Sequence, residues 1–238
     1  MKTLRRWSRP QFLLNRVAVL FILIAASPAR SQQIAQFWPE IDTYIKLNPT
    51  FRLMFNASTT QEAGNTIGSQ FGANFDMFTK PLFKLKRFTI FQLDESKSRP
   101  LTLRIGYNRL PNGDKPPENR VLLDATPRYP LKAGVLLADR NRADLRWING
   151  DFSWRYRNRM VVERTFGIYS YHFTPYVRGE AYYVSSAGKW SRTAEDIGFI
   201  FPIRKRAEIE GYYEHMNDTS KSPNQQTHGI GLVLSFYF

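Results

Sequence analysis

The sequence predicts one all-β domain, an antiparallel up-and-down transmembrane β-barrel of about 12 strands (10 possible), preceded by a signal peptide. Three observations predict it: a basic and then apolar N-terminus, alternation of polar and apolar residues with period two, and an aromatic residue at the end of the last strand. The chain of 238 residues has no cysteine, which excludes disulfide scaffolds, zinc ribbons and thiol nucleophiles. It has no long apolar run beyond the N-terminus, which excludes a bundle of membrane helices.

The N-terminal segment has the layout of a secretory signal peptide. Basic residues without any acid come first, the apolar run 17–26 follows, and small residues around Ala29 offer cleavage sites. The apolar run is shorter than the ~20 residues of a spanning helix; an uncleaved membrane anchor is the alternative. Six of the 34 basic residues lie in residues 1–31, so without this segment the net charge falls from +14 to +8. We expect a signal peptide at 1–31 and a barrel domain at 32–238, with no role in nucleic-acid binding.

The rest of the chain alternates as β-strands do. In 51–58, for example, Phe51, Leu53 and Phe55 fall on one side, and Arg52, Met54 and Asn56 on the other. Apolar residues three and four apart, which a helix needs, are missing. Turn-forming residues separate the segments. We expect strands at 37–47, 50–59, 69–78, 85–94, 99–110, 118–128, 133–148, 151–165, 172–184, 190–201, 204–216 and 226–238.

Three features favour a membrane barrel over a soluble sandwich, which alternates in the same way. The polar side carries many charges, and the segment 229–238 ends with Phe236 and Phe238, which resemble a membrane-insertion signal. The third feature is a set of aromatic residues near segment ends on the apolar side: Trp38, Trp147, Trp154, Trp190, Phe199 and Phe201. A last core strand of a sandwich that happens to end in Phe is the alternative.

These features predict a protein of the bacterial outer membrane. Its partners are then outer-membrane lipid and the barrel-assembly machinery, which is expected to recognise the C-terminal strand. Outer-membrane barrels of one chain have an even number of strands and keep both termini in the periplasm. We therefore expect 12 strands, or 10 if the stretch 81–99 is a loop.

The Asn149-Gly150 pair favours a two-residue type I′ hairpin, which fixes the pairing of its two strands. Asp144 then faces Arg155, while Arg142 faces Arg157 and Arg140 faces Arg159, and like charges placed opposite each other need counter-ions. The polar residues of this region form a candidate lumen charge cluster of Arg140, Arg142, Asp144, Arg146, Arg155, Arg157, Arg159, Glu163, Arg178 and Glu180.

Two interpretations of this cluster stay open: a lumen plugged by salt bridges, and an anion-attracting constriction. Inward acids argue that the lumen is mixed rather than purely cationic: Glu40, Asp42, Asp76, Asp196, Glu208, Glu210 and Glu214.

No catalytic residue, metal site or cofactor is predicted. His172, His215 and His228 have no metal-ligand spacing, and Ser185, Ser186 and Ser235 lie in no nucleophile motif. The leading hypothesis is a structural or narrow-channel protein. The alternatives are an outer-membrane lipid or lipopolysaccharide hydrolase and a soluble periplasmic barrel that binds a ligand.

Short motifs at 139–147, 154–159 and 174–180 resemble the domain-of-unknown-function family 2490. They are DRNRADLRW, WRYRNR and TPYVRGE, and the opening FWPEID at 37–42 and the closing strand at 229–238 are similar too. The resemblance implies an exported bacterial outer-membrane barrel and supplies no activity.

Overall fold

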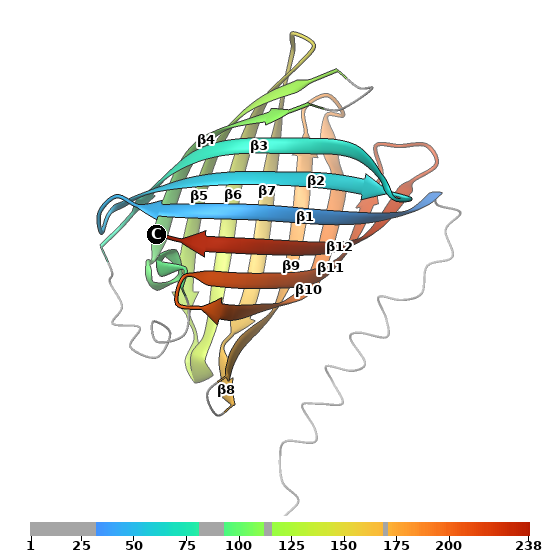
Figure 1. Ribbon diagram of the computed structural model, residues 1–238. Helices are drawn as coiled ribbons and strands as arrows, with labels where there is room; N and C mark the ends of the chain where they lie inside the picture. Colours follow the sequence, from blue (N-terminus) through green and yellow to red (C-terminus); the bar gives the residue numbers. More distant parts are fainter. Residues whose placement is uncertain (1–31, 81–92, 112–115, 169–170) are drawn as a thin grey trace, which may run out of the picture. The chain divides into compact units, whose positions relative to one another are not determined.

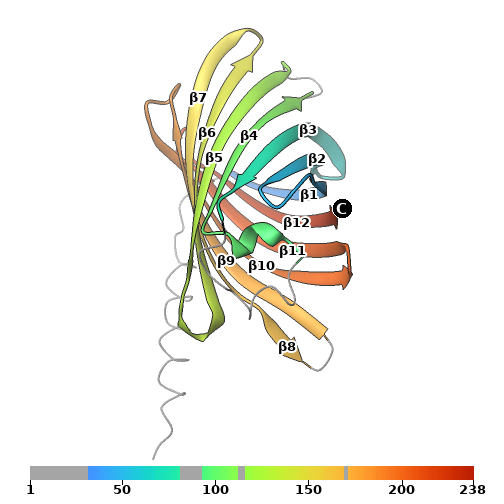
Figure 2. The same cartoon turned by 90° about the vertical axis from the view of Figure 1, so that its left-hand side faces the viewer.

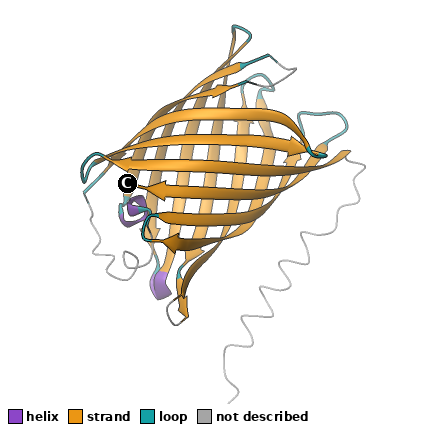
Figure 3. Ribbon diagram, in the orientation of Figure 1, coloured by secondary structure: helices purple, strands orange, loops and turns teal. Residues whose placement is uncertain are grey.

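In a computed structural model, the unit Gln32–Phe238 forms a closed, all-β barrel (Figure 1). The structure describes residues 32–80, 93–111, 116–168 and 171–238. The predicted signal peptide at 1–31 lies outside the described residues and stays a prediction. Figure 3 shows strands making up nearly all of the described chain, and no described helix is long and apolar enough to cross a bilayer.

The barrel wall consists of eleven strands that follow one another around the barrel in chain order. They are β1 (Gln32–Lys46), β2 (Phe51–Glu62), β3 (Asn65–Phe78), β4 (Leu101–Leu110), β5 (Glu118–Pro130), β6 (Val135–Ile148), β7 (Asp151–Arg164), β9 (Tyr171–Val184), β10 (Lys189–Arg204), β11 (Ala207–Asp218) and β12 (Gln225–Tyr237). A twelfth, three-residue strand, β8 (Phe166–Ile168), pairs only with β9. Two 3-10 helices lie between strands, η1 (Glu95–Ser98) and η2 (Lys132–Gly134).

The barrel closes between its first and last strands. All other neighbours are antiparallel, but β1 and β12 are parallel, with Gln32 opposite Gln225 and Tyr44 opposite Tyr237. An up-and-down barrel with an odd number of strands must close with a parallel pair, because consecutive strands alternate in direction. The predicted all-β barrel is therefore confirmed as a closed, mostly antiparallel barrel, whereas the described residues form 11 wall strands rather than the expected even number. Most of the predicted strand at 85–94 lies outside the described residues, and Leu93 and Asp94 precede η1 instead of continuing a strand.

The β6–β7 hairpin has the predicted turn and register. Asn149 and Gly150 have φ values of 53° and 91°, as both central residues of a type I′ turn require. Asp144 pairs with Arg155, Arg142 with Arg157 and Arg140 with Arg159. This prediction is confirmed. We call the end of the barrel with this turn the Asn149 end and the opposite end the η1 end.

The barrel has a polar interior and an apolar exterior. Its buried residues are mostly polar or charged, and Asp76 and Asp144 are 0% exposed. Large apolar residues face outward instead; Phe71, Phe152 and Ile230 are between 55% and 60% exposed. One predicted outward aromatic is wrong: Trp38 lies on the inward face of β1, where its ring covers Gly229 of β12. It shares that face with Glu40 and Asp42 because all three are an even number of residues apart.

The 3-10 helix η1 lies across one mouth of the barrel, at the centre of the end seen in Figure 2. Its segment contacts five strands: Asp94 pairs with Arg52 of β2 at 2.7 Å, Glu95 with Lys46 of β1 at 2.6 Å, and Lys97 with Glu163 of β7 at 2.9 Å. Arg128 of β5 donates to Ser96, and the Leu93 amide donates to Glu208 of β11. Burial raises the pKa of Asp94, but Arg52, Arg128 and Lys97 lower it more, so this pKa lies below its ordinary range. The segment is thus fixed to the wall by charge.

Candidate functional site: a charged barrel lumen

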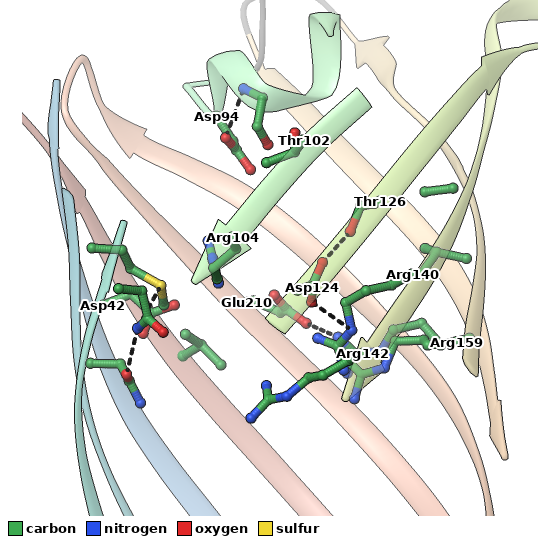
Figure 4. Close-up of a pocket in the computed structure, with 18 of the residues that line it drawn as sticks. Asp42, Asp94, Thr102, Arg104, Asp124, Thr126, Arg140, Arg142, Arg159 and Glu210 are labelled. Carbon is green, nitrogen blue, oxygen red and sulfur yellow. Dashed lines mark hydrogen bonds and ion pairs between the residues drawn. The ribbon is translucent and has the colours of Figure 1, made fainter. Parts of the chain in front are cut away.

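The lumen contains a cavity of about 430 Å³ that is lined mainly by charged and amide side chains. Figure 4 shows part of this lining, with Asp42 on one side and Arg140, Arg142 and Arg159 on the opposite side. A second cavity of about 620 Å³ lies at the η1 end, between η1, the start of β2 and the end of β12. The inward side chains come from alternate positions of every wall strand, as the period of two requires.

Three arginines of the predicted cluster converge on one carboxylate. Glu180 of β9, whose side chain is 1% exposed, accepts from Arg140 at 3.1 Å, from Arg157 at 2.7 Å and from Arg159 at 2.6 Å. Tyr182 also donates to it, at 2.8 Å. Arg140 and Arg159 lie opposite each other, and like charges in this position need a counter-ion. Glu180 is that counter-ion.

Asp144 neutralises a second part of the cluster. Its Oδ1 accepts from Arg142 at 2.6 Å and its Oδ2 from Arg155 at 2.7 Å. Arg146 pairs with Glu118 at 2.7 Å, and Arg178 pairs with both Asp196 and Glu210. Every arginine of the predicted cluster therefore has a carboxylate partner, and the Asp144 and Glu180 side chains are almost inaccessible to solvent. The geometry does not support an uncompensated ring of arginines.

Glu163 lies in the lumen, but its partner is not a residue of the predicted cluster. It binds Lys97 of the η1 segment rather than an arginine of its own hairpin. Of the other predicted residues, Phe236 lies on the outward face of β12, and Phe238 is 61% exposed. The backbone of Phe238 bonds to Tyr44 and Lys46, so the end of the chain continues the pairing with β1.

Asp76, which the sequence places inward, belongs to a further buried ion group whose arginines were not predicted. Arg52 donates to Asp76 Oδ2 at 2.7 Å, and Arg104 donates to Oδ1 at 2.5 Å. All three residues fall on the polar side of their strands, so the sequence itself indicates that they face inward. The contact of Asp76 with Arg104 was hidden because residues 79–100 separate β3 from β4, and so long a connection does not fix a register. The pairing of Arg52 with Asp76 was not hidden in this way, because only Ala63 and Gly64 separate β2 from β3.

The arginines and the acids that have no cationic partner lie on different sides of the lumen. The arginines come mainly from β4 to β9, whereas β11 and β12 contain no lysine or arginine, and β1 contains only Lys46 at its end. Of the inward acids on this second side, Glu40, Asp42 and Glu214 form no ion pair with any described residue. The cavity therefore has ion-paired arginines on one side and these three carboxyl groups on the other.

Two histidines meet on the outer surface of the barrel. His215 of β11 and His228 of β12 lie opposite each other with ring centroids 4.7 Å apart, and the Tyr213 hydroxyl is 2.7 Å from His228 Nδ1. His172 lies on β9, opposite Gly167. In the described part of the chain, no three His, Cys, Asp or Glu side chains are placed to hold a metal ion.

Comparisons with known proteins find no family model that matches the chain and no similar curated protein. The resemblance to family 2490 therefore stays a prediction.

Proposed function

We propose that this protein spans the outer membrane of a Gram-negative bacterium as a barrel, and that its lumen is a narrow, weakly selective passage for small polar solutes. The observation that carries the proposal is the distribution of side chains: ionic groups are enclosed, and apolar groups cover the outside. A soluble barrel instead requires a mainly polar outer surface, because water disfavours large exposed apolar surfaces.

Two outward aromatic clusters support the membrane position. Near the Asn149 end, Trp147 contacts Phe152, and Trp154 and Trp190 both contact Tyr183. Toward the η1 end, Phe173 contacts Phe166 and Phe201, and Phe199 contacts Phe201. Aromatic girdles at both interfaces are typical of transmembrane barrels. The wall strands have 10 to 16 residues, and about 9–11 residues suffice for a tilted strand to cross a bilayer.

The lumen supports a passage for small solutes rather than a wide pore. Its main cavity is about 430 Å³, and η1 narrows one mouth. Because each arginine of the cluster has a carboxylate partner, we expect weak selectivity between anions and cations instead of the strong anion preference of a bare arginine ring.

Tryptophan fluorescence tests the membrane position. Trp147, Trp154 and Trp190 face outward near the Asn149 end, whereas Trp38 faces the lumen. In vesicles, lipids brominated near the headgroup should quench the emission more strongly than lipids brominated at the chain ends. The matched control is a variant that retains only Trp38, which neither lipid should quench strongly. Equal and weak quenching of the wild-type protein by both lipids would refute the proposal.

Planar-bilayer recording tests the passage. Refolded protein with heat-modifiable gel migration should give small, discrete conductance steps with a reversal potential close to zero in a KCl gradient. A folded, inserted protein without conductance would show that the ion pairs close the lumen.

A further inference from the structure

A group of polar side chains lies on the outer face of the barrel, halfway along the β6–β7 hairpin. Asp139 and Asn141 alternate with the inward Arg140, so their side chains point away from the lumen. Asn158 of β7 donates to Asp139 Oδ1 at 2.7 Å and to Asn141 Oδ1 at 3.2 Å. The Tyr156 hydroxyl donates to Asn141 Oδ1 at 2.5 Å. We call Asp139, Asn141, Tyr156 and Asn158 the outer polar cluster, and all four residues are partly exposed.

The outer polar cluster lies between the two outward aromatic clusters. Met160 of β7 pairs with Asp139 on one side and with Gly179 of β9 on the other. Along β9, Gly179 lies between Tyr183, near the Asn149 end, and Phe173, toward the η1 end. In the proposed membrane position the cluster therefore faces hydrocarbon, which offers no hydrogen-bond partner. Acidic side chains at this depth are costly, so a protein surface that covers them is favoured.

The cluster has unused hydrogen-bonding groups of both kinds. Asn141 Nδ2 donates to the backbone oxygen of Asp139 at 3.3 Å, and its second N–H has no acceptor among the described residues. Asp139 Oδ2 and Asn158 Oδ1 accept from no described residue. The ion pairs of β6 and β7 with described residues do not include Asp139. One copy of the chain thus offers a donor at Asn141 and acceptors at Asp139 and Asn158.

We propose that the outer polar cluster is the centre of an interface with a second copy of this chain. Two barrels inserted in the same direction are related by a two-fold axis along the bilayer normal, and this axis keeps each group at the same depth in both copies. Asn141 of each copy then donates to Asp139 of the other, which gives two reciprocal hydrogen bonds. This self-complementarity favours a second copy over acyl chains, which have no donor.

An apolar groove beside the cluster supports the same arrangement. It has a volume of about 550 Å³ and is lined by outward residues of β3 to β7, among which Ala125 and Ala143 are small. The two-fold axis places the groove of one copy beside the β7–β9 side of the other, because it reverses the order of the strands across the interface. Met160 and Val177 are exposed on that side. Small residues let two walls approach closely, and these apolar side chains fill the groove.

Disulfide cross-linking tests the interface, because the wild-type chain has no cysteine. Met160→Cys places one thiol between Asp139 and Gly179, next to the proposed axis. Ile41→Cys is the matched control, because Ile41 is an exposed residue of β1, on the opposite side of the barrel. In vesicles with little protein per lipid, a membrane-permeable oxidant should convert most of the Met160→Cys protein to a covalent dimer. The Ile41→Cys protein should stay mostly monomeric.

Two further substitutions test the polar contacts in the Met160→Cys background. Asp139→Leu removes the acceptor and Asn141→Leu removes the donor, and each should lower the cross-linked fraction at least about fivefold. Both place an apolar side chain against lipid, so the barrel should still fold, which heat-modifiable gel migration checks. Glu195→Gln, on the outward face of β10, should leave the cross-linked fraction unchanged.

The proposal is wrong if folded, inserted Met160→Cys protein stays monomeric, if Ile41→Cys protein cross-links equally, or if neither leucine variant lowers the cross-linked fraction. The inference rests on the proposed membrane position, which the quenching of tryptophan emission by brominated lipids tests separately. Quenching without cross-linking refutes the interface alone, and cross-linking without quenching refutes the membrane position alone.

Discussion

The substitution Glu180→Gln tests whether the lumen arginines depend on their shared carboxylate. The arginines Arg140, Arg157 and Arg159 donate five hydrogen bonds to the Glu180 carboxylate, which is almost inaccessible to solvent. The amide of glutamine has no charge and replaces one acceptor oxygen with a donor that faces arginine. Removing one partner of a buried ion pair costs about 3–5 kcal/mol. Because three cations lose one anion here, we expect a loss near the upper end of that range.

Urea titration of the detergent-folded protein, followed by tryptophan emission, measures the free energy of unfolding. The control Glu195→Gln removes an outward carboxylate that forms no ion pair with a described residue, and it should change the free energy by less than about 0.5 kcal/mol. Should the first variant not fold, Arg140→Gln still tests the reasoning, because it leaves Glu180 with two arginines and should cost about 1–2 kcal/mol. A loss below about 1 kcal/mol for Glu180→Gln, with the barrel intact, would refute the argument.

Two further predictions concern the wall and the mouth. Gly231→Ala should destabilise the barrel by about 1–3 kcal/mol in the same titration, because its Cβ would lie 2.0 Å from the Tyr212 ring; Gly179→Ala, where a Cβ meets nothing within 4 Å, should not. Asp94→Asn should lower the thermal midpoint at pH 7, because it breaks the contact with Arg52. Since the folded pKa of Asp94 is lowered, the stabilisation is present above the ordinary pKa of about 4 and is lost as the pH falls through the lowered folded value. The thermal midpoints of the wild-type protein and the variant should therefore differ at pH 7 and pH 5 and converge only in strong acid. An equally large difference at pH 1 would contradict the stabilising role of the Asp94 carboxylate.

Short-range chemistry explains what the sequence alone predicted well. Asn149 and Gly150 determine a turn, the turn determines a register, and the register brings Arg140 opposite Arg159. The alternation of polar and apolar residues also placed the arginines on the polar face correctly. This pattern is local, because a period of two depends only on neighbouring residues of one strand.

Long-range pairing explains what the sequence did not predict. The parallel contact of β1 with β12 joins residues about 190 positions apart, and no local pattern encodes it. Lys97 became the partner of Glu163 because a segment between strands turns into the mouth of the barrel. Trp38 was placed outside because aromatic residues near strand ends usually are, although its own alternation with Glu40 places it inside.

The parallel seam between β1 and β12 has a topological consequence. Gln32 begins β1 at one rim, and Tyr237 ends β12 at the other. If the barrel spans a bilayer, these two residues face different compartments. An epitope fused after Phe238 and an epitope inserted before Gln32 then lie on opposite sides of the membrane.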